Sequence, residues 1–230
     1  MFFSDLGYDG ALIFTSELNC IEVGDGEIYA ECGSGLGALV KRACEHGFDA
    51  GAELYGIPGS IGGAVRMNAG AFGRAVSDFI QEAEVYDAAT ERTERISARE
   101  LELGYRDSIL QRKPLYVLSA RLKAQRCSQE KISERIRIFS EKRRSSQPSA
   151  PSLGSFYKAF EDVSASKLID DAGLKGLTFG GASISEKHAG FIINNGGATA
   201  NDINSLASVV EEKIMKRYSR QLEREVEFCE

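Results

Sequence analysis

The sequence predicts an α+β fold with antiparallel or mixed sheets rather than a doubly wound parallel sheet. At 43% hydrophobic residues, the 230-residue chain can bury a core of its own. Its alternating apolar segments occur in closely spaced pairs joined by turn residues, which is typical of hairpins. Residues 145–152 hold two of the four prolines and follow a charged helical segment. We therefore expect two α+β units, with a boundary between about 124 and 152 and domain limits of 1–125 and 126–230.

The first elements of the chain are expected to be a hairpin and a helix. Residues 20–33 alternate in character around the turn residues 24–26, which read Gly-Asp-Gly. Residues 36–46 then carry leucine, valine and alanine at helical spacing, and Gly47 provides a stop.

A second group of strands is expected after residue 80. Residues 82–96 indicate another hairpin around the turn at 87–90. Residues 97–100, Ser-Ala-Arg-Glu, have the capping-box pattern of a short helix start. The alternation over 116–123 predicts a further strand.

The second half of the chain is richer in helix. Residues 128–144 place Ile132, Ile136 and Phe139 on one face of a charged helix. A short helix is expected from 164 to 173. The remaining expectations are a strand at 190–195, a helix opening at 199, and a final strand at 222–228.

Charge and hydropathy exclude two classes of partner. The net charge is −6, and no run of lysine and arginine exceeds three residues, so we expect no nucleic-acid partner. No apolar run approaches the roughly 18 residues of a membrane span, and the first residues lack the pattern of a signal peptide. We therefore expect no membrane association.

Cysteine and histidine usage argues against a metal site and a disulfide framework. The five cysteines are odd in number and widely separated, without a Cys-x-x-Cys pair, and there are only two histidines. Free thiols in a reducing cytoplasm are the better interpretation.

Residues 56–73, GIPGSIGGAVRMNAGAFG, form the most informative stretch. Six glycines and a proline within 18 residues are incompatible with a regular helix or a central strand. Unhindered backbone amides beside Ser60 and Asn68 would suit an anion such as a pyrophosphate. A flexible linker is the alternative, but linkers contain few apolar residues, and this stretch includes isoleucine, valine, methionine and phenylalanine.

Four further blocks give this loop a family context. They are ELGYRDS at 102–108, LGSFYK at 153–158, GLKGLTFGGASISEKHAGFIINNGGAT at 173–199 and LEREVEF at 222–228. In this order, from about Asp5 to Phe228, the chain resembles the bacterial UDP-N-acetylenolpyruvoylglucosamine reductase family, specifically its shorter type II branch. The resemblance implies the second half of a vanillyl-alcohol-oxidase/PCMH-type FAD-binding domain, followed by an α+β substrate-binding domain.

The resemblance also implies an activity. Members of the family are cytoplasmic flavin oxidoreductases of peptidoglycan precursor synthesis, and so of cell-wall biogenesis, cell shape and division. They use FAD and NADPH to reduce UDP-N-acetylglucosamine enolpyruvate to UDP-N-acetylmuramate. The oligomeric state cannot be deduced from the residues.

Three residues match the catalytic positions of the family. Arg106 would bind the substrate carboxylate and stabilise the enolate, although an Arg next to an Asp is usually half of a surface ion pair. Ser155 would protonate the carbanionic carbon, although local sequence alone would make it a turn serine. Glu225 would assist that proton transfer. The alternative for Glu225 is a solvated strand edge, because Glu223 and Glu227 would share its face.

The resemblance also implies binding residues. The expected flavin contacts come from the Gly-rich loop: Gly56, Ile57, Pro58, Gly59, Ser60, Gly62, Gly63, Asn68 and Gly70. The expected substrate contacts are Lys158, Lys187 and His188. A lone histidine near an apolar strand is, however, more often structural than a ligand.

Two departures from the family pattern lead to a second hypothesis. Lys158 is followed by Ala159 and Phe160, where family members have a small polar residue or arginine and then proline. The family's first flavin subdomain, which contains a pyrophosphate loop, has no counterpart ahead of Asp5. We therefore expect weak or absent flavin binding by the chain as given. The alternative is a non-catalytic remnant or binding scaffold that does not hold FAD.

Overall fold

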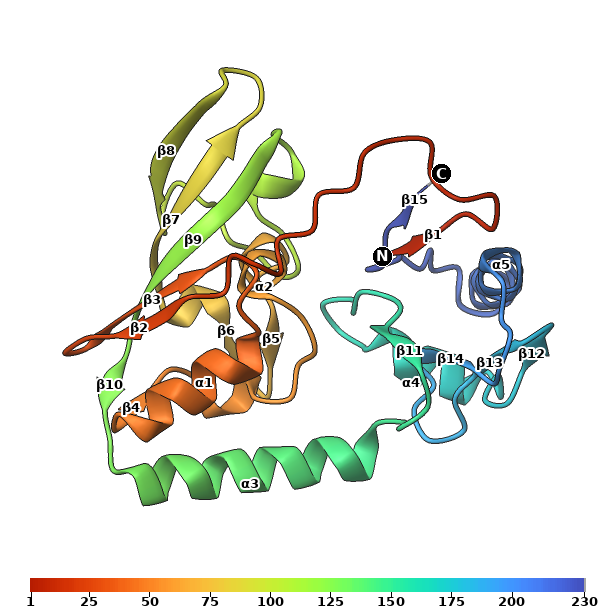
Figure 1. Ribbon diagram of the computed structural model, residues 1–230. Helices are drawn as coiled ribbons and strands as arrows, with labels where there is room; N and C mark the ends of the chain where they lie inside the picture. The colour runs from red at the N-terminus through yellow and green to blue at the C-terminus, as the bar shows by residue number, and fades with distance from the viewer. Residues whose placement is uncertain (230) are drawn as a thin grey trace. The chain divides into compact units, whose positions relative to one another are not determined.

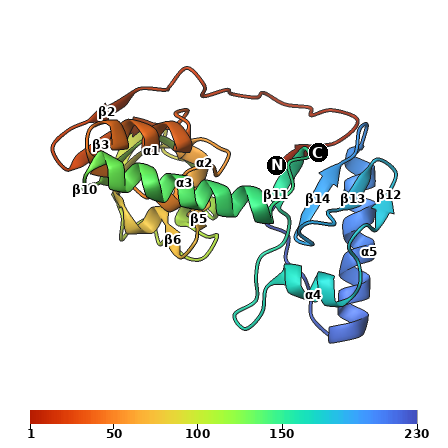
Figure 2. The same cartoon turned by 90° about the horizontal axis from the view of Figure 1, so that it is seen from below.

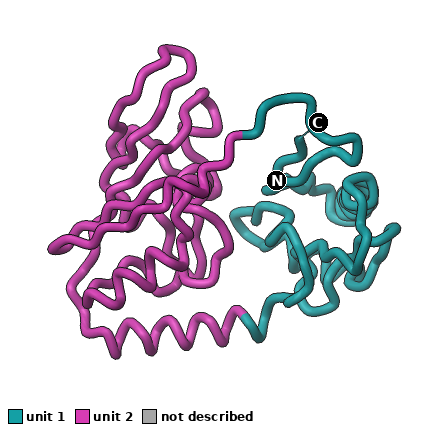
Figure 3. The backbone as a smooth tube through the Cα atoms, in the orientation of Figure 1, with its two compact units in different colours: residues 1–12, 144–230 teal, residues 13–143 magenta. Residues whose placement is uncertain are grey.

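The structure, a computed structural model, describes residues 1–229 (Figure 1). The described chain forms two compact units (Figure 3). Unit 2 is the continuous stretch Ile13–Arg143, and unit 1 combines Met1–Leu12 with the residues from Arg144 onward. The charged helix therefore groups with unit 2, whereas the limits of 1–125 and 126–230 assign it to the second domain.

Unit 2 is built on a five-stranded antiparallel sheet with the order β2-β3-β9-β7-β8 (Figure 1). The strands are β2 (Ile21–Val23), β3 (Glu27–Glu31), β7 (Ile80–Asp87), β8 (Arg92–Ser97) and β9 (Leu115–Lys123). Both expected hairpins and the expected strand at 116–123 are confirmed. The antiparallel pairing also confirms the expected sheet type.

Alternation along these strands places the apolar residues on one face of the sheet. Ile28 pairs with Leu122 and Ala30 with Ala120 across β3 and β9, and all four are buried. They share one core with the buried side of α1 (Leu36–Glu45) and of α2 (Ile61–Arg66). This packing fixes the loops that enter α1 and α2.

Helix α3 (Gln129–Ser146) confirms the expected charged helix and includes the first two residues of the expected linker. Its Ile132 is fully buried beside Cys44 and Ala52. Arg135 forms ion pairs with two carboxylates of unit 2, those of Asp49 and Glu53. Ile136 also packs on the core of unit 2, and the ring of Phe139 stacks on that of Phe72 at 5.0 Å, so the expected apolar face and a forked ion pair hold α3 on unit 2.

Several short elements of unit 2 were not expected. These are β4 (Phe48–Asp49), which pairs with β10 (Gln125–Arg126), the hairpin of β5 (Gly70–Ala71) and β6 (Arg74–Ala75), and the 3-10 turns η1 (Ala52–Leu54), η2 (Val76–Asp78) and η3 (Ile109–Gln111).

Unit 1 contains a four-stranded antiparallel sheet with the order β11-β14-β13-β12. Its strands are β11 (Ser152–Ser155), β12 (Thr178–Phe179), β13 (Ala182–Ile184) and β14 (Phe191–Asn194), and its helices are α4 (Ala165–Asp171) and α5 (Ala200–Tyr218). Figure 2 shows α5 running beside this sheet. The expected short helix, the strand at 190–195 and the long helix are confirmed.

The N-terminus of α5 is closely tied down. Thr199 and Asp202 form a capping box, and the carboxylate of Asp5 accepts the amide N–H groups of Ala200 and Asn201 at 2.7 and 2.9 Å. Negative charge there is stabilised by the helix dipole. Just ahead of Asp5 in the sequence, β1 (Phe2–Phe3) pairs in parallel with β15 (Phe228–Cys229).

Three expectations about local structure are wrong. The expected strand at 222–228 does not form as one element: Arg224 makes an isolated bridge, the next two residues bend, and β15 begins only at Phe228. The Gly-rich loop contains the short helix α2, since Ser60 caps it and Ile61 and Val65 are buried. The capping box of Ser97 and Glu100 forms, but the turn does not continue into a helix.

None of the helices within residues 1–229 is both long and apolar enough to cross a membrane.

Candidate functional site

The Gly-rich loop packs against the turn that opens α1. Leu36 donates its N–H to Gly59 O at 3.0 Å, and Ile61 donates its N–H to Ser34 O at 2.8 Å. Ser60 Oγ accepts the N–H of Gly63 at 3.3 Å as the cap of α2. These bonds give the loop one conformation, so the structure rules out the flexible-linker alternative.

The glycines of the loop serve two purposes. A Cβ on Gly70 would lie 2.7 Å from Arg74 O, so this glycine permits close packing. Gly56 and Gly59 have φ of 83° and 141°, which other residues rarely adopt. A Cβ built on Gly59 has nothing within 4 Å. The backbone is therefore bare and accessible at Gly59, as a loop that approaches a ligand requires.

Sequence reasoning missed Gly33, which lies in the turn between β3 and α1. A Cβ there would lie 1.8 Å from Thr15 O, so no other residue fits. Glycine recurs at every second position in residues 32–37, which read CGSGLG. This alternation was a signal that could have identified Gly33.

Asn68 connects the Gly-rich loop to the block that contains Arg106. It is buried and adopts φ of 42°. Its Nδ2 donates to Gly104 O at 2.7 Å, and its Oδ1 accepts the N–H of Ser77 at 2.9 Å. The amide is thus committed to fixing the loop, and its expected contact with flavin remains a proposal.

Arg106 lies directly against the Gly-rich loop. Its Nη2 donates to Gly70 O at 3.0 Å, and its backbone has φ of 52°. The neighbouring Asp107 pairs instead with Arg112, which also binds Glu102 at 2.8 Å. The structure thus excludes the ordinary surface ion pair between Arg106 and Asp107 as the reason for this arginine.

A cavity of about 320 Å³ adjoins the start of the Gly-rich loop. It is lined by Gly37, Ala38, Lys41, Tyr55, Gly56, Ile57 and Pro58. Three of the expected flavin contacts therefore line one cavity with an aromatic ring and a cation. The hollow is open to solvent and mostly apolar, so it and the bare backbone at Gly59 suit one part of a flat, partly charged cofactor such as FAD.

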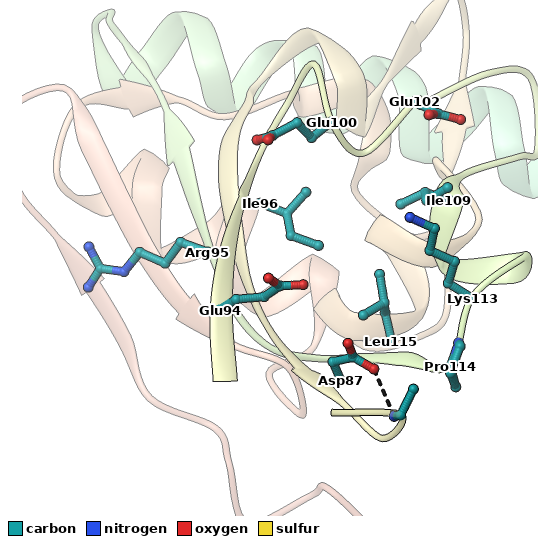
Figure 4. Close-up of a pocket in the computed structure, with 11 residues that line it drawn as sticks. Asp87, Glu94, Arg95, Ile96, Glu100, Glu102, Ile109, Lys113, Pro114 and Leu115 are labelled. Carbon is teal, nitrogen blue, oxygen red and sulfur yellow. Dashed lines mark hydrogen bonds between the residues drawn. The ribbon is translucent and has the colours of Figure 1, made fainter. Parts of the chain in front are cut away.

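A second cavity, of about 390 Å³, lies at the β7–β8 hairpin (Figure 4). Two of its carboxylates already have structural partners: Asp87 accepts the N–H of Ala89 at 2.8 Å, and Glu100 accepts the hydroxyl of Ser97 at 2.6 Å. These hydrogen bonds lower the pKa of both carboxyls. No expected site residue lines this cavity.

Unit 1 brings the segments of Ser155 and Glu225 together. Ser155 ends β11, and its hydroxyl donates to Tyr157 O at 3.4 Å. Glu225 donates its N–H to Phe156 O at 2.8 Å. Glu225 is half-buried, whereas Glu223 and Glu227 are exposed, so the solvated strand edge does not describe it.

The three expected substrate-binding residues have partners inside unit 1. Lys158 Nζ pairs with Glu223 at 2.6 Å, and Lys187 Nζ donates to Arg144 O at 2.5 Å. His188 Nδ1 accepts the N–H of Gly190 at 3.1 Å, and burial lowers its pKa. These contacts explain the three side chains structurally, and their substrate contacts remain proposals.

The candidate site is therefore described in two halves. Arg106 and the Gly-rich loop belong to unit 2, and Ser155 and Glu225 belong to unit 1. No group of three or more His, Cys, Asp or Glu side chains in the described part of the chain could hold a metal ion.

Comparisons with known proteins match the two halves separately. Residues 2–97 match the model of an FAD binding domain. Residues 147–229 match the model of the C-terminal domain of UDP-N-acetylenolpyruvoylglucosamine reductase. Together they confirm the expected order of a flavin domain followed by the family's C-terminal domain.

Similar whole proteins agree. The chain is 40% identical over 228 residues to the UDP-N-acetylenolpyruvoylglucosamine reductase of Caldicellulosiruptor bescii, covering 98% of this chain and 72% of that protein. It is 42% identical over 223 residues to the Clostridium beijerinckii protein of the same name, covering 96% and 73%.

A solved structure supports the same relationship. The crystal structure of UDP-N-acetylenolpyruvylglucosamine reductase from Thermus caldophilus matches with a TM-score of 0.80 and 33% identity, over 90% of this chain and 74% of that one. With both domain models matched in order and about 40% identity to curated relatives, the chain belongs to the UDP-N-acetylenolpyruvoylglucosamine reductase family.

Proposed function

We propose that this protein catalyses the FAD-dependent reduction of UDP-N-acetylglucosamine enolpyruvate to UDP-N-acetylmuramate, with NADPH as the hydride donor. Family membership supports the reaction. Among the contacts, the one that carries the proposal is the hydrogen bond from Arg106 Nη2 to Gly70 O, at 3.0 Å. It joins a guanidinium to the Gly-rich loop, the combination that this chemistry needs.

FAD, when bound, would supply the hydride chemistry. The candidate residues for holding it are those of the Gly-rich loop, with Gly56, Ile57 and Pro58 lining the adjacent cavity. Bare backbone at Gly59 leaves room for close approach. The apolar side chains that line this open hollow would contact one face of a flat ring.

Arg106 is proposed to bind the substrate carboxylate. Reduction of an enol ether next to a carboxylate builds negative charge on that group, and a fixed cation stabilises it. A guanidinium presents two parallel N–H donors to the two oxygens, which an ammonium cannot do. The hydrogen bond to Gly70 and the left-handed backbone at Arg106 fix its position before substrate arrives.

Ser155 is proposed to deliver the proton to the α-carbon, with Glu225 assisting. A serine hydroxyl is a weak acid, so it can donate only to a strongly basic, closely positioned carbanion. Glu225 lies on the segment that pairs with the residues after Ser155. Its carboxyl group is thereby a candidate to polarise or reprotonate the serine.

The first test is an absorption spectrum of the purified chain with and without added FAD. A flavin spectrum near one per chain supports the proposal. A protein that remains colourless after FAD is added and removed would favour the non-catalytic scaffold.

The second test separates the two half-reactions by stopped-flow absorbance. NADPH should bleach the flavin, and the enolpyruvyl substrate should restore its colour. Flavin that is reduced by NADPH but not reoxidised by this substrate would overturn the proposed reaction.

A further inference from the structure

The residues after Ser155 pair with the segment that carries Glu225. Lys158 donates its N–H to Glu223 O, and Glu225 donates its N–H to Phe156 O, both at 2.8 Å. Between these bonds, Tyr157 and Arg224 oppose each other in an isolated antiparallel bridge. With only two backbone hydrogen bonds, such a short pairing needs side-chain support to hold one register.

That support comes from Arg224, which forms a forked ion pair with α5. Its Nε donates to Glu211 Oε1 at 2.6 Å, and its Nη2 donates to Glu211 Oε2 at 3.1 Å. Its Nη1 donates to Asn204 Oδ1 at 2.9 Å. The two ion-pair side chains are 30% and 29% exposed, so water screens the pair only in part.

Tyr157 is anchored on the same helix. Its hydroxyl donates to Ala207 O at 3.1 Å, and burial raises its pKa. Residues 204, 207 and 211 recur at spacings of three and four, which places them on one face of α5. Both segments of the short pairing are therefore attached to one face of α5.

We propose that Arg224, held by Glu211, is a positioning residue that sets Glu225 and Ser155 in their relative places. This rests on the proposed function for Ser155 and Glu225. Arg224 itself need not touch substrate. Its guanidinium attaches the Tyr157–Arg224 bridge to α5. Two parallel hydrogen bonds to one carboxylate fix the orientation of the guanidinium as well as its distance from Glu211.

The test compares Arg224→Met with a matched control. Met keeps the length and apolar body of the side chain and removes the fork. Arg220→Met is the control, because Arg220 forms another two-pronged pair in unit 1, with Asp162 at 2.6 and 2.7 Å. That pair joins other residues than the bridge does, so its loss should leave the bridge intact.

Amide hydrogen exchange, read residue by residue, gives a result that does not need activity. In Arg224→Met, exchange at the amides of Lys158 and Glu225 should quicken about tenfold or more, because local opening becomes easier. Glu211→Gln should have a smaller effect of the same kind. Arg220→Met should leave both amides unchanged. Unaltered exchange in Arg224→Met would overturn the proposal.

Kinetics of the flavin-loaded protein give the second result. In Arg224→Met, reoxidation of reduced flavin by the enolpyruvyl substrate should slow about 10- to 100-fold, with substrate KM within about twofold, since a misplacement near 1 Å has such an effect. Arg224→Lys should recover part of the rate. Reduction by NADPH should not change.

The outcomes separate this inference from the proposed function. If Arg224→Met loses no more rate than Arg220→Met, the positioning role of Arg224 is overturned. The proposed function would still stand in that case, provided that the unmodified protein turned over its substrate. An unmodified protein without turnover would overturn the proposed function. Hydrogen exchange would then still decide whether Arg224 holds the bridge.

Discussion

At the scale of single residues, the most informative side chain is Arg106. It adopts a left-handed backbone, and its guanidinium donates to the Gly-rich loop instead of pairing with the adjacent Asp107. Backbone strain of this kind costs about 1–3 kcal/mol and persists only where the surroundings enforce it. Such enforcement is typical of a side chain whose direction matters.

Arg106→Lys should therefore lower the rate of substrate reduction about 100-fold or more, because the charge stays and the fork is lost. Flavin reduction by NADPH should persist, as measured by stopped-flow bleaching. The control is Arg112→Lys, at an exposed arginine that pairs with Asp107 and Glu102. Equal loss in the two half-reactions of Arg106→Lys would contradict the assigned role.

His188 gives a prediction about pH. Burial lowers its pKa below the ordinary value of 6.5, and its Nδ1 must stay unprotonated to accept the N–H of Gly190. The unfolded state then binds the proton at a higher pH than the folded state. The stability that neutral His188 contributes is therefore present above about pH 6.5 and is lost as pH falls. The free energy of unfolding should decrease accordingly.

Urea unfolding at about pH 7.5 and about pH 5 would measure this decrease. His188→Gln should show a smaller decrease than the unmodified protein. His46→Gln, at the exposed histidine of α1's C-terminal end, serves as control. A pH dependence that survives in His188→Gln would assign the effect to other groups.

At the scale of elements, α3 combines apolar packing with one partly buried ion-pair cluster. Ile132 is its one fully buried residue among those described, and Arg135 reaches Asp49 and Glu53. The side chain of Glu53 is only 9% exposed, so its charge needs the arginine.

Arg135→Met should lower the free energy of unfolding by about 1–3 kcal/mol, since it leaves a buried carboxylate without its cation. Arg137→Met removes exposed pairs with Glu134 and Glu141 on the same helix, and should change it by about 0.5 kcal/mol or less. Chemical denaturation of both variants would measure this difference. Similar losses in the two would show that Glu53 does not depend on Arg135.

The sequence predicted those elements whose cause is local. The hairpins followed from alternation and turn residues, and α5 followed from the Thr199 cap and its apolar spacing. Helix α2 was missed because its glycines disfavour helix, and only burial of Ile61 and Val65 overrides that preference. The pairing of Arg224 with Tyr157 and the ion pair of Arg224 with Glu211 were missed. The sequence predicts helix α5 but does not show that α5 packs beside these segments.

The candidate site was predictable to a similar extent. Sequence blocks proposed Arg106, Ser155 and Glu225 as candidate residues, and the structure adds the contacts that position each of them. Gly33 was missed because the need for glycine there comes from the close approach of Thr15 O. This contact between separate segments exists only in the folded chain.

At the scale of the whole molecule, the two units have separate hydrophobic cores. The proposed FAD contacts all belong to unit 2, and the residues proposed for proton transfer, Ser155 and Glu225, belong to unit 1. A ligand stabilises only the structure to which it binds, by about 2.7 kcal/mol at a concentration 100 times its Kd. The two units should therefore respond differently to the cofactor.

Because weak flavin binding is expected, FAD should be added well above its Kd. It should then slow hydrogen exchange in α1, α2 and the Gly-rich loop, and leave the core of α5 unchanged. Free riboflavin, which lacks the diphosphate and adenosine, is the control and should protect less. Protection confined to unit 1 would contradict the assignment of the flavin loop.

The pairing of Ser155's segment with that of Glu225 also has a consequence for how the molecule folds. The two segments are separated in sequence by α4, α5 and strands β12, β13 and β14, so they can meet only after a long loop has closed. Contacts between distant parts of a chain form slowly. The Gly-rich turns, whose partners are nearer in sequence, should assemble first. Partly folded molecules would then contain the Gly-rich loop before Ser155 and Glu225 had been brought together.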